Sequence, residues 1–353
     1  MLWCGIPLTA RCYAVAGASS MRALRSQSSN DFPNWHSLSP NWWHINYTEG
    51  HDNERAVAFW YQAGQQASAR FAIREAVAHF AKGIALLAAL PDSEARDRRE
   101  LEFQLALIVS LVAMHGFGSD EVEVCAKRAK DLSDRCGDAH SRFAAYRFVW
   151  NSCLLRRPLA QTVALARTLM DLAREDNDAA RLAIAHRALG RSIQIAGMQA
   201  DADELLATGA TLADSVADAE FTAYSEHPGI ICRAYRGQLR CLRGFLDDAA
   251  RLAETAVERA RMVYSPFVLA WSLIVAAQTH LFRRDACAAE RAAREAITLS
   301  REHGLPQWMA FGQQCLGLVL CQQADWRAGI ELQREAMDSL HATGSLLHTW
   351  SWS

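Results

Sequence analysis

Lysine is nearly missing from this sequence. Its 353 residues contain only three lysines, Lys82, Lys127 and Lys130, and none of them follows a glycine or precedes a serine or threonine. A phosphate-binding loop of the form G-x4-G-K-[ST] needs that lysine to reach the β- and γ-phosphates of a nucleotide. The sequence therefore excludes ATP hydrolysis by a P-loop.

Turn-forming residues and long apolar runs are also scarce. Eight prolines and 19 glycines are few for an all-β protein of this length, and no strand-like alternation stands out. No stretch reaches about 18 uninterrupted apolar residues, the length that a membrane-spanning helix requires. A net charge of −2 gives no general attraction to phosphate backbones. We therefore expect an all-α cytoplasmic protein that contacts neither a membrane nor nucleic acid directly.

Motifs for metal binding and catalysis are absent as well. The ten cysteines include no C-x-x-C pair, and the motifs G-x-S-x-G and H-E-x-x-H do not occur. Glu302-His303 lacks the second histidine that a zinc pair needs four residues from the first. Most cysteines lie in apolar stretches, which is typical of buried free thiols. The sequence predicts a non-enzyme with no catalytic residue, no metal site and no cofactor.

What the sequence does contain is one helix-sized segment after another, rich in Ala, Leu, Arg and Glu. Breaks such as Gly137-Asp138 and His227-Pro228-Gly229 separate them. Pairing consecutive segments predicts about seven helical hairpins. They span about 52–91, 97–136, 139–176, 179–215, 228–262, 266–303 and 306–343.

Five of the predicted hairpins share a notch of small residues. A small residue in one helix precedes a small residue in the next helix by twelve positions, and the last three pairs begin 40 residues apart, at 237, 277 and 317. Two antiparallel helices approach closely only where side chains are small, so a tandem hairpin needs such a notch in each copy. The pairs are Gly64/Ala76, Gly190/Ala202, Gly237/Ala249, Ala277/Ala289 and Gly317/Gly329.

The first hairpin carries a fuller signature. Trp60 lies four residues before Gly64, Phe80 lies four after Ala76, and Pro91 ends the second helix. This W-x3-G, A-x3-F and P arrangement resembles the tetratricopeptide repeat, although a spacing of about 40 exceeds the usual 34 or so. We expect an all-α, tetratricopeptide-like α-solenoid.

Longer phrases resemble one family: NYTEGHDNERAVAFWYQAGQQA (46–67), EAVAHFAKGIALLAALPDS (75–93), GFGSDEVE (116–123), HPGIICRAY (227–235) and SREHGLPQWMAFG (300–312). The family is the C-terminal helical-repeat region of bacterial signalling proteins that combine a class III adenylate/guanylate cyclase or another effector with a predicted ATPase. The resemblance implies a regulatory, non-catalytic segment that binds partners or ligands. His227 stands where the family usually has an acidic residue, and the catalytic modules are absent from the chain.

Binding residues follow from the register of the notch. Residues about three before, one after and four after each notch of a first helix should face the concave side of a solenoid. The Gln and Arg among them favour a polar peptide or an anionic partner, although hydrated surface is the more common use of such residues. The concave-face candidates are Tyr61, Gln65, Arg187, Arg191, Gln194, Gln238, Gln278 and Gln314. We expect Trp271, Trp308 and Trp326 to fill gaps between helices rather than bind a ligand.

Two functions remain open. The first is a scaffold that binds a protein or peptide in the concave groove, as a fragment of a cyclase/ATPase-type signalling protein. The alternative is a small-molecule sensor of an ATPase-type transcription regulator, with a pocket at Tyr224, Glu226 and His227.

The two ends differ from the predicted repeat domain of 46–345. Residues 1–45 hold many serines and no helical period, so we expect a poorly ordered or non-native leader there. Residues 346–353 contain Leu346, Leu347, Trp350 and Trp352, which predict a truncated apolar tail. Because a solenoid needs a polar cap at its end, this tail suggests self-association or a missing remainder.

Overall fold

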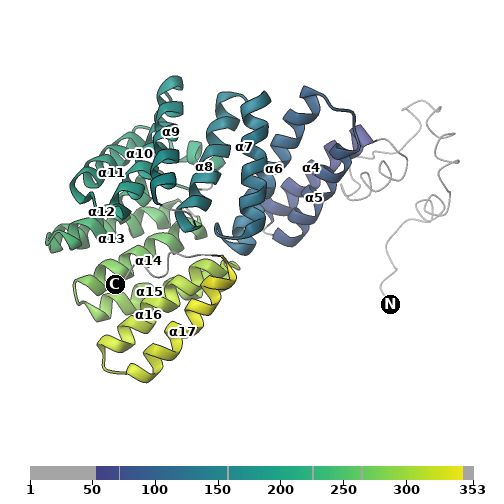
Figure 1. The fold of residues 1–353 in the computed structure, drawn as a ribbon. Coiled ribbons are helices and arrows are strands. Elements are labelled where there is room, and N and C mark those ends of the chain that lie inside the picture. Colours follow the sequence, from purple (N-terminus) through teal and green to yellow (C-terminus); the bar gives the residue numbers. More distant parts are fainter. Residues whose placement is uncertain (1–52, 71, 157–158, 225, 264, 345–353) are drawn as a thin grey trace, which may run out of the picture. The chain divides into compact units, whose positions relative to one another are not determined.

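A computed structural model describes residues 53–344 apart from 71, 157–158, 225 and 264. The described residues form fourteen α-helices and a short 3-10 helix, with no strand among them (Figure 1). The first helices of the hairpins are α4 (Asn53–Ala69), α6 (Glu94–His115), α8 (Ala139–Arg156), α10 (Ala179–Ile195), α12 (Pro228–Leu242), α14 (Pro266–Phe282) and α16 (Pro306–Gln322). The second helices are α5 (Ile73–Ala88), α7 (Asp120–Cys136), α9 (Leu159–Asp176), α11 (Gln199–Asp214), α13 (Leu246–Met262), α15 (Ala286–Glu302) and α17 (Trp326–Ala342), and η2 (Asp218–Tyr224) precedes α12.

The prediction of seven successive helix pairs is confirmed, with boundaries within a few residues of those expected. The predicted leader, residues 1–45, and the apolar tail, residues 346–353, lie outside the described residues. Backbone contacts divide the chain into two compact units, up to Phe103 and from Gln104 onward.

The first unit shows how its hairpin uses the small-residue notch. Gly64 on α4 faces the ring of Phe80 on α5, and Gly83 faces the ring of Phe103. A Cβ atom on either glycine would overlap the ring that it faces. Here the notch is therefore filled by an aromatic side chain from the neighbouring helix, as the A-x3-F signature requires.

In the second unit the notch works in two ways. A Cβ on Gly190 would lie 2.8 Å from Leu206 Cγ, so there a large side chain again fills the space. A Cβ on Gly237 would lie 3.1 Å from the carbonyl oxygen of Ala249, and one on Gly317 would lie 2.9 Å from that of Gly329. Where no large residue follows the notch, the helices approach backbone to backbone.

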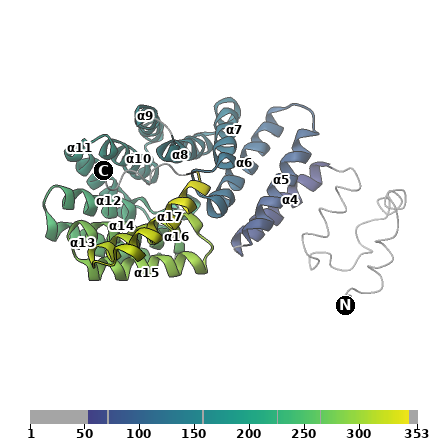
Figure 2. The same cartoon turned by 60° about the horizontal axis from the view of Figure 1, so that its bottom comes forward.

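Each hairpin of the second unit packs on its neighbour. Helix α10 contacts α12, α12 contacts α14, and α14 contacts α16, so the first helices follow one another along the stack. Figures 1 and 2 show the α14/α15 and α16/α17 hairpins side by side in both views. The first helices of the second unit therefore form one continuous row, which contributes the residues of the candidate site.

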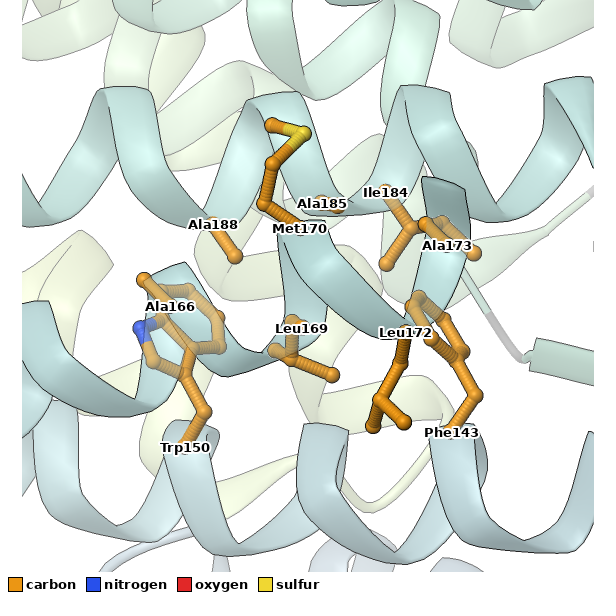
Figure 3. Packing of buried hydrophobic residues seen from close by; sticks show 10 residues of the cluster. All are labelled: Phe143, Trp150, Ala166, Leu169, Met170, Leu172, Ala173, Ile184, Ala185 and Ala188. Atoms are coloured by element: carbon orange, nitrogen blue, oxygen red, sulfur yellow. The ribbon is translucent and has the colours of Figure 1, made fainter. Parts of the chain in front are cut away.

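An apolar cluster joins the third hairpin to the first helix of the fourth (Figure 3). Phe143 and Trp150 on α8 pack against Leu169 on α9 and Ile184 on α10, and all four side chains are fully buried. The indole nitrogen of Trp150 donates to Ser192 Oγ at 3.0 Å. Helices α8 and α10 are thus held together by apolar burial and one satisfied polar contact.

The turn between α6 and α7 contacts a part of the chain almost 200 residues away. The backbone N–H of Phe117 donates to the side-chain oxygen of Gln307, the second residue of α16, at 3.1 Å. The backbones of Gly118 and Gly344 approach so closely that a Cβ on Gly344 would overlap the Gly118 carbonyl. In a simple repeat stack each hairpin contacts only its neighbours. These contacts therefore join non-adjacent hairpins within the second unit.

The described residues show neither a membrane-spanning helix nor a metal-binding cluster. None of their helices combines the length and apolar character needed to cross a bilayer. They contain no group of three or more His, Cys, Asp or Glu side chains arranged to hold a metal ion.

Thiol reactivity gives a direct test of this packing. Burial raises the pKa of both Cys232 and Cys315 to about 12, whereas Cys287 is exposed. Because the thiolate is the reactive form, we expect iodoacetamide at about pH 8 to modify Cys287 and to spare Cys232 and Cys315 until the chain is unfolded. Peptide mass spectrometry measures each site. Equal labelling of Cys232 and Cys287 in the folded protein would contradict the burial of Cys232.

Candidate functional site

The second unit contains a cavity of about 440 Å³ on the side of the stack formed by the first helices. Five of these helices, α8, α10, α12, α14 and α16, contribute to its wall, together with Phe117 from the turn after α6. The volume lies within the range of ligand pockets. The lining residues are Phe117, Asn151, Leu154, Leu155, Arg191, Gln194, Ile195, Gly197, Gln199, Tyr235, Gln238, Leu242, Trp271, Ile274, Val275, Gln278, Phe282, Gln307, Trp308 and Phe311.

A chain of glutamine amides crosses this wall. Gln194 Nε2 donates to Gln238 Oε1 at 3.2 Å, and Gln238 Nε2 donates to Gln278 Oε1 at 3.1 Å. Because each amide nitrogen carries two N–H groups, these bonds leave a second donor on Gln194 and Gln238. One side chain from each of α10, α12 and α14 thus forms a continuous polar strip.

Aromatic rings form a second part of the wall. Trp271 stacks on Trp308 with ring centroids 5.0 Å apart, and the Trp271 indole donates to the Tyr235 hydroxyl at 3.0 Å. Phe267 contacts Trp308 at 5.1 Å and Phe117 at 6.1 Å, both edge to face. The cavity therefore offers aromatic faces beside the polar strip.

Arg191 is the one charged side chain among the lining residues. Its Nη1 donates to Gln194 Oε1 at 2.9 Å and to Gln238 Oε1 at 3.3 Å, and the guanidinium lies 4.3 Å from the centre of the Tyr235 ring. No described carboxylate lies within ion-pair distance of it. The cavity thus has a positive charge balanced locally by amide dipoles alone.

One turn earlier on α10, Arg187 is fully buried and is not among the residues that line the cavity. Its Nη2 lies 2.9 Å from Glu226 Oε2, and the same carboxylate is 3.7 Å from Arg147 on α8. The Arg187 guanidinium covers the ring of Trp150 at 4.8 Å. A buried carboxylate between two guanidinium groups thus ties the turn before α12 to α8 and α10.

The turn before α12 holds the other sequence candidates. His227 caps α12, because its Nδ1 accepts from the backbone N–H of Ile230 at 3.4 Å, while its Nε2 lies 2.9 Å from Asp218 Oδ1. Glu226 is held by the arginines described above. The side chain of Tyr224 lies outside the described residues. Neither Glu226 nor His227 lines the cavity.

The structure brings together half of the concave-face candidates. Arg191, Gln194, Gln238 and Gln278 all line the cavity. Arg187 is buried in its ion group, and Gln314 is buried with its backbone oxygen bonded to the Gln333 amide, so neither is in the lining.

Tyr61 and Gln65 belong to the first unit. The Tyr61 ring packs 5.0 Å from Phe103 and lies under the Arg99 guanidinium at 4.6 Å, while Gln65 is exposed. Burial is the largest cause that raises the pKa of Tyr61 above its usual value.

Sequence reasoning missed several lining residues. Asn151 was missed because the third hairpin shows no notch from which to count. Trp271 and Trp308, which we expected to fill gaps between helices, line the cavity, whereas Trp326 is 61% exposed. Trp271 and Phe311 each lie six residues before a notch, but Tyr235 lies two before and Trp308 nine before, so no single register selects the aromatic wall.

Gln307 offers a local test of the contact between non-adjacent hairpins. The substitution Gln307→Ala would leave the buried N–H of Phe117 without its partner, at a cost of about 1–3 kcal/mol. We expect a lower unfolding midpoint in urea and faster amide exchange at Phe117. Unchanged exchange at Phe117 would contradict the contact.

Comparisons with known proteins agree on the fold. The Rap conjugation gene regulator of the plasmid pLS20, solved in complex with the Phr* peptide, matches with a TM-score of 0.63 and 13% identity over 95% of this chain and 85% of that one. This chain shares the helical-repeat fold of that regulator. A Rap protein complexed with competence and sporulation factor has a TM-score of 0.58 and 11% identity over 84% of this chain and 79% of its own, and apo RapI has 0.58 and 12% over 81% and 98%.

No family model and no curated protein sequence matches this chain. At identities of 11–13% the likeness to Rap structures is one of fold. This fold is the tetratricopeptide-like solenoid that the sequence predicts.

Proposed function

We propose that this protein is a non-catalytic helical-repeat scaffold that binds a peptide segment of a partner in the cavity of its second unit. The observation that carries the proposal is the convergence of five successive first helices on one cavity, with linked amides on one part of its wall and aromatic rings on another. Amide groups can pair with a peptide backbone, and aromatic faces can take its apolar side chains.

The Rap structures support a peptide as the ligand. One of the similar chains was solved in complex with the Phr* peptide, and another in complex with competence and sporulation factor. This chain shares their fold, and its cavity has the volume for a few residues of a bound chain.

A retention experiment tests the proposal. A synthetic random hexapeptide library is passed over immobilised wild-type protein, over the double variant Gln238→Ala/Gln278→Ala, and over Gln323→Ala, which alters an exposed amide outside the cavity. We expect a set of peptides retained by wild type and by Gln323→Ala, and retained about tenfold less by the double variant because the polar strip is gone. Equal retention by all three proteins, or by none, would overturn the proposal.

Small-molecule sensing is the competing function. The cavity volume also suits a metabolite. A thermal-shift screen with sugars, nucleotides and peptides separates the two, because a ligand that binds the folded state raises its melting temperature. Stabilisation by a metabolite, lost in Gln238→Ala/Gln278→Ala, would favour the sensor. Since Glu226 and His227 have structural partners, we assign the ligand to the cavity and not to their turn.

The sequence resemblance supports a finer proposal about the cellular role. The scaffold would regulate an effector of the cyclase/ATPase signalling type, with partner binding at the repeats as its input. The coding DNA on both flanks tests this. An in-frame ATPase or cyclase domain would support the proposal, and unrelated genes in other frames would oppose it.

A further inference from the structure

This inference rests on the proposed function and concerns the chemistry of the ligand. We propose that the cavity holds a carboxylate of the bound peptide against Arg191 and Asn151. The argument starts from the charges of the wall. The lining residues include one arginine and no aspartate or glutamate, so a ligand carboxylate meets no like charge there.

Arg191 is equipped to accept such a group. Its hydrogen bonds to described residues use Nη1 alone, and its Nε is buried without a partner among them. The edge of a guanidinium formed by Nε and Nη2 is one of those that bind a carboxylate through two parallel hydrogen bonds. The stacking of Arg191 on Tyr235 keeps the guanidinium plane fixed, so little side-chain freedom is lost on binding.

Asn151 is the second, independent observation. Its side chain is only 3% exposed, it lines the cavity, and its Nδ2 has no hydrogen-bond partner. A buried amide N–H without a partner costs free energy that a ligand acceptor would recover. The structure therefore presents an unsatisfied donor that faces a cavity with an unneutralised cation.

The two residues lie where α8 meets α10. Trp150, which precedes Asn151, donates to Ser192, which follows Arg191. Among the described residues, Glu226 is the one carboxylate of the neighbouring ion group, and it is engaged by Arg187 and Arg147. It does not extend to Arg191, which leaves a ligand to supply the counter-charge.

The experiment uses three hexapeptide libraries on immobilised full-length protein. The first has free C-terminal acids and no Asp or Glu, the second has C-terminal amides and no Asp or Glu, and the third has C-terminal amides with Asp and Glu allowed. We expect wild type to retain the first or the third library about tenfold more than the second, because a charge-assisted pair with arginine is gained. The first library identifies a C-terminal carboxylate as the source, and the third identifies a side-chain carboxylate.

Variants assign the effect to the site. Arg191→Gln should remove the preference for carboxylates, and Arg251→Gln, which alters an exposed arginine paired with Asp248, should leave the preference intact. Should Arg191→Gln fail to fold, the wild-type preference itself must weaken between about 50 and 500 mM NaCl, since salt screens a partly exposed pair.

The remaining outcomes separate this inference from the proposed function. Equal retention of all three libraries by wild type, above that by Gln238→Ala/Gln278→Ala, would overturn the carboxylate subsite and leave peptide binding standing. A carboxylate preference that persists in folded Arg191→Gln would also overturn it. Retention of no library above the double variant would overturn peptide binding and the subsite together.

Discussion

Replacing Glu226 with alanine should destabilise this protein more than any surface change. The variant leaves Arg187, which is fully buried, and Arg147, which is 3% exposed, without the carboxylate that lies between them. Breaking a buried ion group by removing one partner costs about 3–5 kcal/mol, because an uncompensated charge stays in the interior. Urea unfolding followed by circular dichroism measures this as a lower midpoint.

A matched control is available in the same unit. Glu295 pairs with Arg261 at 2.8 Å, but both side chains are about half exposed. Solvent weakens such a pair, so Glu295→Ala should cost about 0–1 kcal/mol. A loss below about 1 kcal/mol for Glu226→Ala as well would show that water reaches the ion group, contrary to the burial described above.

Gly317→Val should produce the second large effect. A Cβ at this position would already lie 2.9 Å from the backbone oxygen of Gly329, and the β-branched side chain adds two methyl groups. Backbone cannot rotate away as a side chain can, so α16 and α17 must separate. We expect a loss of about 3 kcal/mol, at the upper end of the usual range for overpacking.

The place of the damage is as informative as its size. Because repeat stacks are stabilised by each hairpin and its neighbours, amide exchange should accelerate first in α16 and α17. Thr208→Val, at an exposed position of α11, is the control and should change stability by less than about 0.5 kcal/mol. Uniformly faster exchange over the whole second unit would contradict a local opening.

The helices were predictable because their signals are local. Three first helices of the second unit begin with proline, at 228, 266 and 306, and Ser119, Asp178 and Ser265 accept the capping hydrogen bonds of α7, α10 and α14. Periodic apolar residues between such signals fix a helix without knowledge of its neighbours. The small-residue notch then predicted which helices pair into hairpins.

Residues of the site were predictable only where they keep the same spacing from the notch in successive hairpins. Arg191, Gln238 and Gln278 each follow a notch residue by one position, and all three line the cavity. The register is less reliable three positions before the notch. There Ile274 lines the cavity, whereas Arg187 is buried against Trp150.

Partners distant in sequence were beyond prediction. Glu226 lies 39 residues from Arg187, and the sequence around either residue does not predict the other as its partner. The pairing follows from how hairpins four and five stack, which depends on the size of every side chain between them. For that reason a pocket at 224–227 stayed open as an alternative to a simple connection between helices, although Glu226 and His227 have structural partners there.

The hydrogen bond between Phe117 and Gln307 also constrains how this protein can change over evolution. Tandem arrays ordinarily gain or lose whole copies of their unit, since each copy meets only the adjacent ones. Here four complete hairpins, α8 to α15, lie between the two partners of that bond. Duplicating or deleting one of them would carry Gln307 away from Phe117 and remove a residue from the wall of the cavity. Copy number in this stretch is thus tied to the ligand site, and variation in length should be tolerated only outside it.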